Sequence, residues 1–146
     1  VPGNVVIDAH ERQRRIAAYH RPYHARITAA IDGCLAGGIS PRIISIHSFT
    51  PELDGFSRPW QIGVLWKRDP GRNAQVIAAL RARGHLVGDN EPYDGHVAMG
   101  YSLDHHGVQR KLWHQMFEIR NDLIRSPEGQ AFWAGEIAEV LEQAVE

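Results

Sequence analysis

A histidine and a glutamate are the residues of this sequence best placed to do chemistry together. His47 follows the short apolar run 43–46, and Glu118 lies between the apolar residues 117 and 119. Histidine ligates metals and titrates near neutral pH, and a carboxylate among apolar neighbours is costly to bury unless it is paired or used. The alternative to a functional role is a structural one. His47 would then be a histidine hydrogen-bonded at a strand end, and Glu118 would form an ion pair with Arg120 or another arginine.

The other candidate residues carry weaker signals. His20 and His24 have the i, i+4 spacing with which one helical face can grip a metal, but Pro22 lies between them and His20 falls in an apolar stripe, which favours packing. His105 and His106 are adjacent, and adjacent side chains rarely converge on one ligand. Each is therefore expected to be a solvated loop residue. No glycine-rich phosphate loop, serine nucleophile elbow or paired-cysteine zinc motif is present.

The elements that must position His47 and Glu118 follow from hydrophobic periodicity. Residues 43–46 are short and β-branched, which is typical of a strand covered on both faces. Residues 61–66 alternate as a second strand, residues 72–83 form a short helix, and residues 86–88 form a third strand. Strand, helix and strand in this order predict a βαβ unit, with ligands bound beyond the carboxyl ends of the strands.

The two ends of the chain favour helices. Asp8 and Glu11 form a capping pair at the start of a long amphipathic helix that ends at residues 37–38, and Pro22 predicts a kink or break near residues 18–21. A terminal helix begins at Ser126. Its expected buried face comprises Phe132, Trp133, Ile137, Val140, Leu141 and Ala144.

The remaining segments are two long irregular stretches and one strand. Residues 49–59 and 90–107 are rich in turn formers and are expected to be loops, which in a compact domain are more often functional than idle. Residues 111–120 alternate as a strand that places Glu118 on the face opposite Phe117. The expected fold class is α/β, with a mainly parallel or mixed sheet flanked by helices.

Composition limits the classes of protein. With 146 residues, 43% of them hydrophobic and 23% charged, a single domain over residues 1–146 is expected. A formal net charge of −1 disfavours nucleic acid and anionic lipid as partners. A single cysteine, no signal-peptide pattern and no apolar run of about 18 residues predict a cytoplasmic protein without membrane spans.

Six motifs in series resemble the N-formylglutamate amidohydrolase family, in matching order and spacing from near residue 3 to the terminal helix. They are YHRPYH (19–24), SIHSFTP (45–51), GVLW (63–66), VGDNEPY (87–93), DHHG (104–107) and FEIRNDLI (117–124). The resemblance implies a fold similar to that of zinc carboxypeptidases and aspartoacylases. It also implies zinc-dependent hydrolysis of a small-molecule N-acyl amino acid, with N-formyl-L-glutamate giving formate and glutamate.

The same resemblance implies residue roles. His47 corresponds to a Zn²⁺ ligand, and Glu118 to the carboxylate that takes a proton from the attacking water and relays it to the leaving amine. Three arginines, Arg120, Arg58 and Arg21, are candidates to hold the substrate's carboxylates, because guanidinium groups suit planar anions. Further positions within the motifs that are expected to line the site are His24, Tyr93 and His106.

The sequence departs from the family pattern at its start. The family's first metal-binding histidine lies in a segment that would precede Val1, and His10 is no substitute because it falls in a first helical turn rather than at a strand end. We therefore expect the chain to be roughly the C-terminal half of an amidohydrolase domain. Two alternatives stay open: a deacylase or peptidase of the same fold with another substrate, and a non-catalytic binding fragment. The residues do not predict the oligomeric state.

Overall fold

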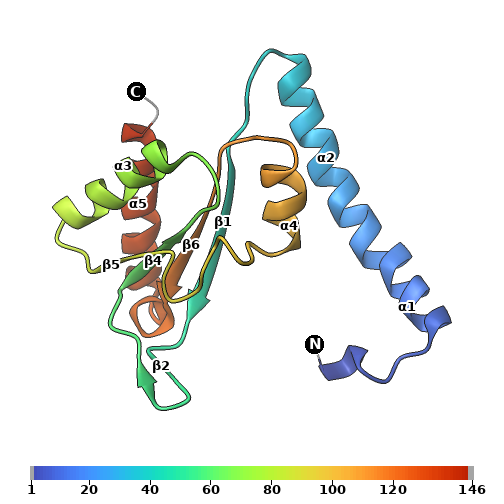
Figure 1. Ribbon diagram of the computed structural model, residues 1–146, viewed down its shortest axis with the longest axis horizontal. Coiled ribbons are helices and arrows are strands. Elements are labelled where there is room, and N and C mark those ends of the chain that lie inside the picture. The colour runs from blue at the N-terminus through green and yellow to red at the C-terminus, as the bar shows by residue number, and fades with distance from the viewer. Residues whose placement is uncertain (1, 145–146) are drawn as a thin grey trace. The chain divides into compact units, whose positions relative to one another are not determined.

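The computed structural model describes residues 2–144, and the chain divides into two compact units, Val1–Pro41 and Arg42–Glu146. The helices and strands are coloured in chain order in Figure 1. Within residues 2–144, no helix combines the length and the apolar character needed to cross a bilayer.

The first unit is helical. The short helix η1 (Pro2–Asn4) precedes α1 (Ala9–Arg15), a π-helical turn η2 (Ile16–His20) and α2 (Arg21–Ala36). Asp8 caps α1, because its Oδ1 accepts the backbone N–H of Glu11 at 2.7 Å, as the capping pair predicts. The predicted break is the π-helical turn, which closes where the N–H of Arg21 bonds to the carbonyl of Ile16, just before Pro22. The sequence predicts an amphipathic helix here, yet two of its large apolar residues, Tyr19 and Tyr23, are exposed.

The second unit is built on a four-stranded mixed sheet in the order β1-β6-β4-β5. Its strands are β1 (Ile43–Phe49), β6 (His114–Arg120), β4 (Ile62–Leu65) and β5 (Val87–Asp89). β1 runs parallel to β6 and β4 parallel to β5, whereas β4 and β6 are antiparallel. The α/β class with a mixed sheet is thus confirmed.

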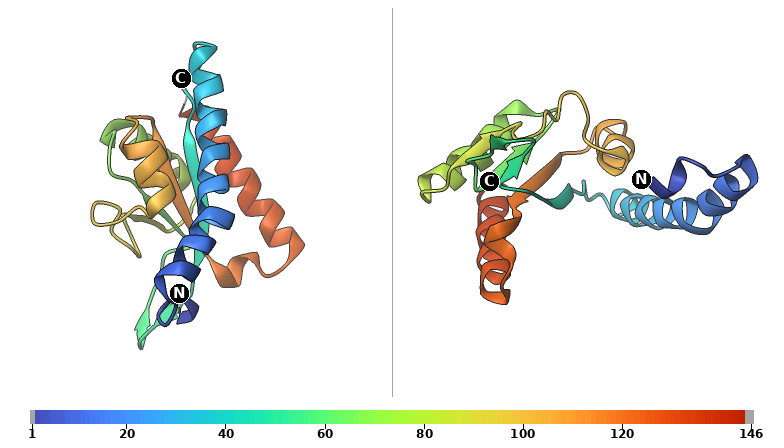
Figure 2. Two further views of the ribbon diagram at one scale, coloured as in Figure 1. Left: turned by 90° about the vertical axis from the view of Figure 1, so that its right-hand side faces the viewer. Right: turned by 90° about the horizontal axis from the view of Figure 1, so that it is seen from below.

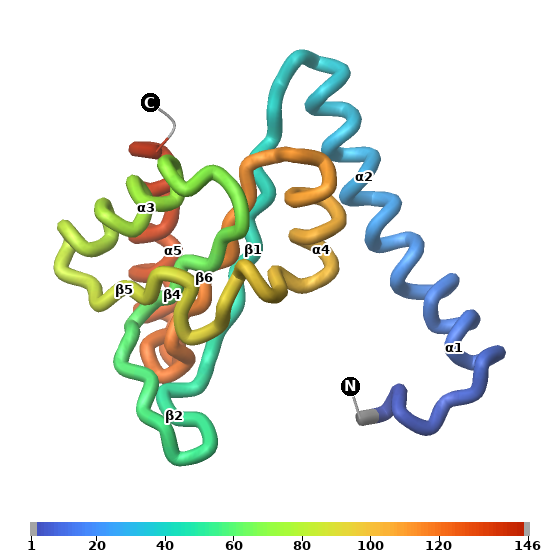
Figure 3. Tube along the Cα trace, in the orientation of Figure 1, coloured from blue at the N-terminus to red at the C-terminus, as the bar shows by residue number. Residues whose placement is uncertain are grey.

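The predicted strand, helix and strand are β4, α3 (Pro70–Ala82) and β5, and their path is traced in Figure 3. Asp69 begins α3, with its side chain accepting the N–H of Arg72. Gly84 follows the helix with φ 90°, a value that suits glycine, and turns the chain towards β5. This segment is therefore the parallel βαβ unit that the periodicity predicts.

Helices cover both faces of the sheet, and Figure 2 shows α4 and α5 on opposite sides of the strands. On one face, α3 and α5 (Pro127–Gln143) bury the main core against β4 and β6. On the other, α4 (Tyr101–Leu103) and the π-helical turn η3 (Asp104–Val108) cover a smaller cluster. The smaller cluster contains Leu65, Met99, Leu103 and Met116.

Two predicted loops contain regular structure. Residues 49–59 include the hairpin β2 (Glu52–Leu53) and β3 (Phe56–Ser57), whose two-residue turn places Asp54 and Gly55 at positive φ. The second loop includes α4 and η3. The prediction for β1 was also too short, because the strand continues through His47 to Phe49.

The terminal helix α5 begins where the sequence predicts, with the N–H of Gly129 bonded to Ser126 Oγ at 3.2 Å. It follows the 3-10 turn η4 (Asn121–Ile124). The prediction that Phe132 is buried is wrong. Phe132 is exposed, because the helix turns Trp133, Ile137 and Val140 towards the core instead.

Candidate functional site

His47 and Glu118 lie side by side at the carboxyl ends of two parallel strands. They are partners in the β1–β6 register, and their side chains approach to 3.7 Å between Nδ1 and Oε1. The imidazole is 52% exposed and the carboxylate 5% exposed. The pair therefore presents an accessible nitrogen in front of a buried acid, at the sheet edge where α/β proteins bind ligands.

The environment of Glu118 favours its protonated form. Burial raises the pKa of this carboxyl above its ordinary value, while the nearby His47 and Arg58 act in the opposite direction with smaller effect. Oε2 of Glu118 is buried and accepts no hydrogen bond from residues 2–144. A buried carboxylate with one unused oxygen is suited to taking up and releasing a proton.

Arg58 and Tyr93 form a second pair beside Glu118. Arg58 is buried, with 8% of the residue exposed, and its Nη1 donates a hydrogen bond to the Tyr93 hydroxyl at 3.1 Å. Its guanidinium carbon lies 5.2 Å from the centre of the Tyr93 ring and 5.9 Å from that of Phe49. The site thus holds a fixed positive charge close to its buried acid.

Local backbone geometry places both members of this second pair. The hairpin returns the chain so that the N–H of Arg58 bonds to the carbonyl of Pro51 at 2.8 Å. Tyr93 follows the cis peptide Glu91-Pro92. The Glu91 carbonyl rests directly on Gly63 and Gly88, at positions where a Cβ atom would overlap it. Glycine inside these strands therefore lets the Tyr93 loop lie against the sheet.

The other predicted substrate-binding residues are placed differently. Arg120 donates from Nε to Asp122 Oδ1 at 2.8 Å and from Nη1 to the carbonyl of Pro59 at 3.0 Å, so its guanidinium joins two backbone segments. His106 is 1% exposed within η3, and the expectation of a solvated loop histidine is therefore wrong. The π-helical turn buries it, with the adjacent Gly107 packed against His114. A substrate role for Arg120 or His106 stays a prediction.

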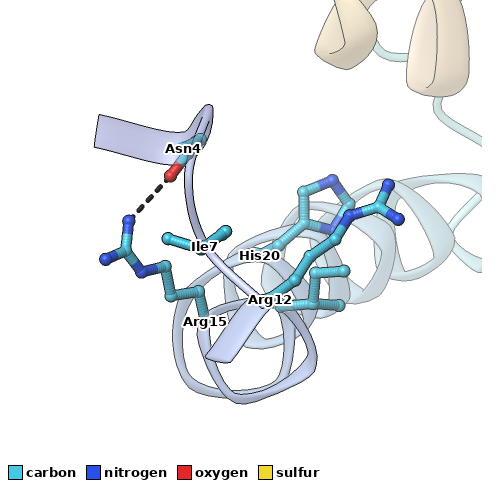
Figure 4. A pocket seen from close by; sticks show the side chains of 6 residues that line it. Asn4, Ile7, Arg12, Arg15 and His20 are labelled. Atoms are coloured by element: carbon cyan, nitrogen blue, oxygen red, sulfur yellow. Dashed lines mark hydrogen bonds between the residues drawn. The ribbon is translucent and has the colours of Figure 1, made fainter. Parts of the chain in front are cut away.

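Arg21 and His24 lie on α2 in the first unit, so their predicted role at the site stays a prediction. The rings of His20 and His24 are 4.3 Å apart between centroids. His20 also lines an open pocket of about 340 Å³ within this unit, shown in Figure 4, where Arg15 bonds to Asn4. His24 lines the adjoining pocket of about 440 Å³.

Too few side chains that could ligate a metal surround His47 for a catalytic metal site. Zinc in catalytic sites has three protein ligands and one open position. Within residues 2–144, no group of three or more histidine, cysteine, aspartate or glutamate residues is arranged to hold a metal ion. His47 and Glu118 alone do not complete a zinc site.

Sequence reasoning missed Gly63, Gly88 and Asn90 as residues that shape the site. Asn90 has φ 52°, and its Oδ1 accepts the backbone N–H of Trp66 at 2.9 Å, which fixes the start of the Tyr93 loop. A usable signal was present: an isolated glycine within a strand pattern often marks the close approach of another backbone segment.

Comparisons with known proteins identify the family and the fold that this chain resembles. A family model described as N-formylglutamate amidohydrolase matches residues 3–125. The crystal structure of gene product Atu2144 from Agrobacterium tumefaciens is 33% identical, with a TM-score of 0.90, and the match covers 99% of this chain and 57% of that one. The comparison with curated proteins finds no match.

A second solved structure shows the same fold at lower identity. It is described as N-formylglutamate amidohydrolase from Ralstonia eutropha JMP134, and it is 23% identical with a TM-score of 0.66 over 92% of this chain and 53% of that one. The chain thus spans a little over half the length of both structural relatives. The match over residues 3–125 shows that this chain belongs to the N-formylglutamate amidohydrolase family.

Proposed function

We propose that this chain carries the proton-transfer and carboxylate-binding residues of a hydrolase that cleaves the linear amide bond of an N-acyl amino acid. The proposed substrate is N-formyl-L-glutamate, and the products are formate and L-glutamate. The observation that carries the proposal is the pairing of His47 with the buried Glu118 at the carboxyl ends of β1 and β6. Family membership supports the bond type.

Glu118 would accept a proton from the attacking water and pass it to the leaving nitrogen. Amide hydrolysis needs both transfers, because water is a weak nucleophile and an amine departs only after protonation. The raised pKa of Glu118 brings its proton affinity closer to that needed at neutral pH, and Oε2 is unused by residues 2–144. One carboxyl can therefore serve as base and then as acid.

Arg58 would bind a carboxylate of the substrate. Nη1 already donates to Tyr93, which fixes the plane of the guanidinium, and the other N–H groups can pair with an anion. Burial strengthens such a pair because the surrounding dielectric is low. Arg58 is thus favoured over Arg120, whose donors are already engaged by Asp122 and Pro59.

We also propose Zn²⁺ as the cofactor, with His47 as one ligand. The accessible imidazole beside a carboxylate supports this assignment. The ligands within residues 2–144 fall short of the three that a catalytic zinc needs, so the remaining ligands must come from elsewhere, and we assign no catalytic step to the metal.

Formate release from N-formyl-L-glutamate tests the proposal. The assay uses this chain supplied with Zn²⁺, and a chimera in which residues 1–146 replace the matched 57% of the Agrobacterium relative. The Glu118→Gln variant of the chimera should lose about 10²–10⁴-fold in kcat, the usual contribution of positioned proton transfer. Glu128→Gln, which alters an exposed carboxylate at the start of α5, serves as the control.

Two outcomes would contradict the proposal. A folded chimera that releases no formate removes the proposed substrate, and a panel of other N-acyl amino acids then identifies any other amide that is cleaved. Full activity in Glu118→Gln removes the proposed role of that carboxyl.

A further inference from the structure

One ring nitrogen of His96 faces two groups with opposite hydrogen-bonding character. Asn90 Nδ2 lies 3.0 Å from His96 Nδ1, and Asp94 Oδ1 lies 3.1 Å from the same atom. The amino group of an amide only donates, whereas an ionised carboxylate only accepts. Because a ring nitrogen either carries a proton or offers its lone pair, His96 Nδ1 can bond to only one of these neighbours at a time.

The orientation of the Asn90 amide is fixed by its oxygen. Oδ1 accepts the backbone N–H of Trp66 at 2.9 Å and that of Gly95 at 3.3 Å. Both partners are donors, so the oxygen must face them and the amino group must face His96. The bond between Asn90 and His96 therefore requires a bare Nδ1, as in the neutral ring that carries its proton on Nε2.

Asp94 is placed to take the opposite part. Its Oδ1 already accepts the backbone N–H of His96 at 2.8 Å. This N–H foremost, and the His96 ring after it, lower the pKa of Asp94, so the carboxylate is ionised while the ring gains a proton. A protonated ring then donates from Nδ1 to Asp94 in a charge-assisted bond. The same N–H opposes the amino group of Asn90.

The remaining charged groups on this side of the ring have partners of their own. The Trp66 ring meets the His96 ring edge-on, with centroids 5.0 Å apart, and its Nε1 donates to Asp89 Oδ1 at 2.7 Å. Lys67, the next residue along the chain, lies 3.8 Å from Asp104. The His96 side chain is 54% exposed, so solvent protons reach it directly.

The bonds made by Asn90 control the loop that carries Tyr93. Through its oxygen, Asn90 joins Trp66, just after β4, to Gly95 on the far side of the loop. Tyr93 lies between these anchors, and its hydroxyl accepts the hydrogen bond from Arg58. A change in the bonding of Asn90 therefore acts on both ends of this loop.

We propose that Asn90, Asp94 and His96 form a proton-sensitive latch on the loop that carries Tyr93. With a neutral ring the latch is closed, because Nδ1 accepts from Asn90. When His96 gains a proton, Nδ1 donates to Asp94 instead, Asn90 loses a partner, and the loop loosens. Histidine is the side chain suited to such a change between about pH 8 and 5. The latch does not rest on the proposed function; only its effect on substrate binding does.

Nuclear magnetic resonance tests the latch on this chain without any activity assay. At pH 8, the ¹⁵N shifts of His96 should show a ring protonated at Nε2 and bare at Nδ1. As the ring gains its second proton towards pH 5, the amides of Trp66 and Gly95 should lose protection against hydrogen exchange. After correction for the intrinsic pH dependence of exchange, we expect the loss to be at least about tenfold.

Three variants locate the device. His96→Asn provides an amide oxygen that can accept from Asn90 and does not titrate, so protection should persist from pH 8 to 5. Asp94→Asn removes the charge that favours the protonated ring, and the loss of protection should move to lower pH. His10→Asn is the control: it removes an exposed histidine of α1 and should leave the pH dependence unchanged.

Any of three results would overturn the latch: a proton on Nδ1 of His96 at pH 8, unchanged protection while the ring titrates, or equal losses in the wild type and His96→Asn. Kinetics on the chimera report separately on the proposed function. The KM for N-formyl-L-glutamate should rise towards pH 5 more steeply in the wild type than in His96→Asn. Coincident KM profiles, with the exchange results as expected, would contradict the substrate-binding role of the Tyr93 loop and leave the latch intact.

Discussion

Gly63 of β4 lies directly opposite Glu118 of β6 in the antiparallel register, so the buried acid of the candidate site has a residue without a side chain as its neighbour. The vacant space is filled by the backbone carbonyl of Glu91. Tyr93 follows two residues later and accepts the hydrogen bond from Arg58. The glycine in β4 therefore connects the sheet to the loop that completes the site.

Replacing this glycine should damage both stability and the site. In Gly63→Ala, the new methyl group overlaps the Glu91 carbonyl, and such overpacking typically costs about 1–3 kcal/mol of unfolding free energy. Gly135→Ala is the control, because nothing lies within 4 Å of its added Cβ and it is in the helix α5. It should gain about 0.5–1 kcal/mol. Urea unfolding measures both, and equal effects of the two variants would refute the packing argument.

Arg58 and Arg120 should respond differently to the same substitution. Arg58→Lys keeps the charge and loses the planar fork, so we expect the KM for N-formyl-L-glutamate to rise about tenfold or more with little change in kcat. Arg120→Lys should leave KM near the wild-type value and lower thermal stability, because its contacts are with Asp122 and Pro59. Steady-state kinetics on the chimera distinguish the two. A rise in KM confined to Arg120→Lys would reverse the assignment.

The stability of the second unit should record the raised pKa of Glu118. Burial raises this pKa above the ordinary value of 4.5, so the folded state binds the proton more tightly than the unfolded chain. Stability is therefore lost as the pH rises from about 4.5 through the folded-state pKa, at up to about 1.4 kcal/mol per pH unit. Glu118→Gln removes this loss, and its stability relative to the wild type should increase with pH.

Glu128→Gln should change the pH dependence of the unfolding free energy in the opposite direction. A hydrogen bond from Ser126 lowers the pKa of Glu128, so this carboxyl stabilises the fold above its unfolded-state pKa and the effect is lost as the pH falls. Chemical unfolding between about pH 2 and 8 compares the variants, since the Glu128 effect lies below pH 4.5 and the Glu118 effect above it. Parallel curves for the wild type and Glu118→Gln would show that burial does not perturb Glu118.

The pairing of His47 with Glu118 was predictable from sequence, and the partners Arg58 and Tyr93 were not separable from other candidates. Periodicity places residues on strands, and parallel strands align their carboxyl ends, so two strand residues far apart in the chain can be matched. Both residues lie outside the main sheet: Arg58 follows the β2–β3 hairpin, and Tyr93 lies in the loop after β5. Their approach depends on contacts of Gly63 and Gly88 that no local pattern describes.

The two wrong predictions from the sequence, for His106 and for Phe132, have similar causes. The turn-rich segment that contains His106 was predicted to be irregular, yet it forms α4 and a π-helical turn that buries the imidazole. Phe132 fits the helical spacing of the buried face but lies at its margin, where its ring meets that of His85 edge-on with centroids 5.9 Å apart. In both cases tertiary packing decides burial, and spacing alone does not.

Besides the apolar core between α3 and α5, Glu136 of α5 binds Arg83 and His85, which directly follow α3, and this polar link should be sensitive to acid. Arg83 donates to both carboxylate oxygens at 2.6 Å, and His85 Nε2 lies 2.5 Å from Oε2. These partners, Arg83 foremost, lower the pKa of Glu136 from 4.5 to about 2. The stabilisation is complete above pH 4.5 and is lost as the pH falls towards 2.

Glu136→Gln should therefore cost about 2–3 kcal/mol of unfolding free energy at pH 7, after allowance for solvent screening. Glu139→Gln is the matched control, since Glu139 also contacts Arg83, at 2.8 Å, but is 56% exposed and should contribute less than about 1 kcal/mol. Urea unfolding at pH 7 measures both costs, and repetition at lower pH should bring the Glu136→Gln curve towards that of the wild type near pH 2. A cost for Glu139→Gln equal to that for Glu136→Gln would show that the buried pair is not the link between α3 and α5.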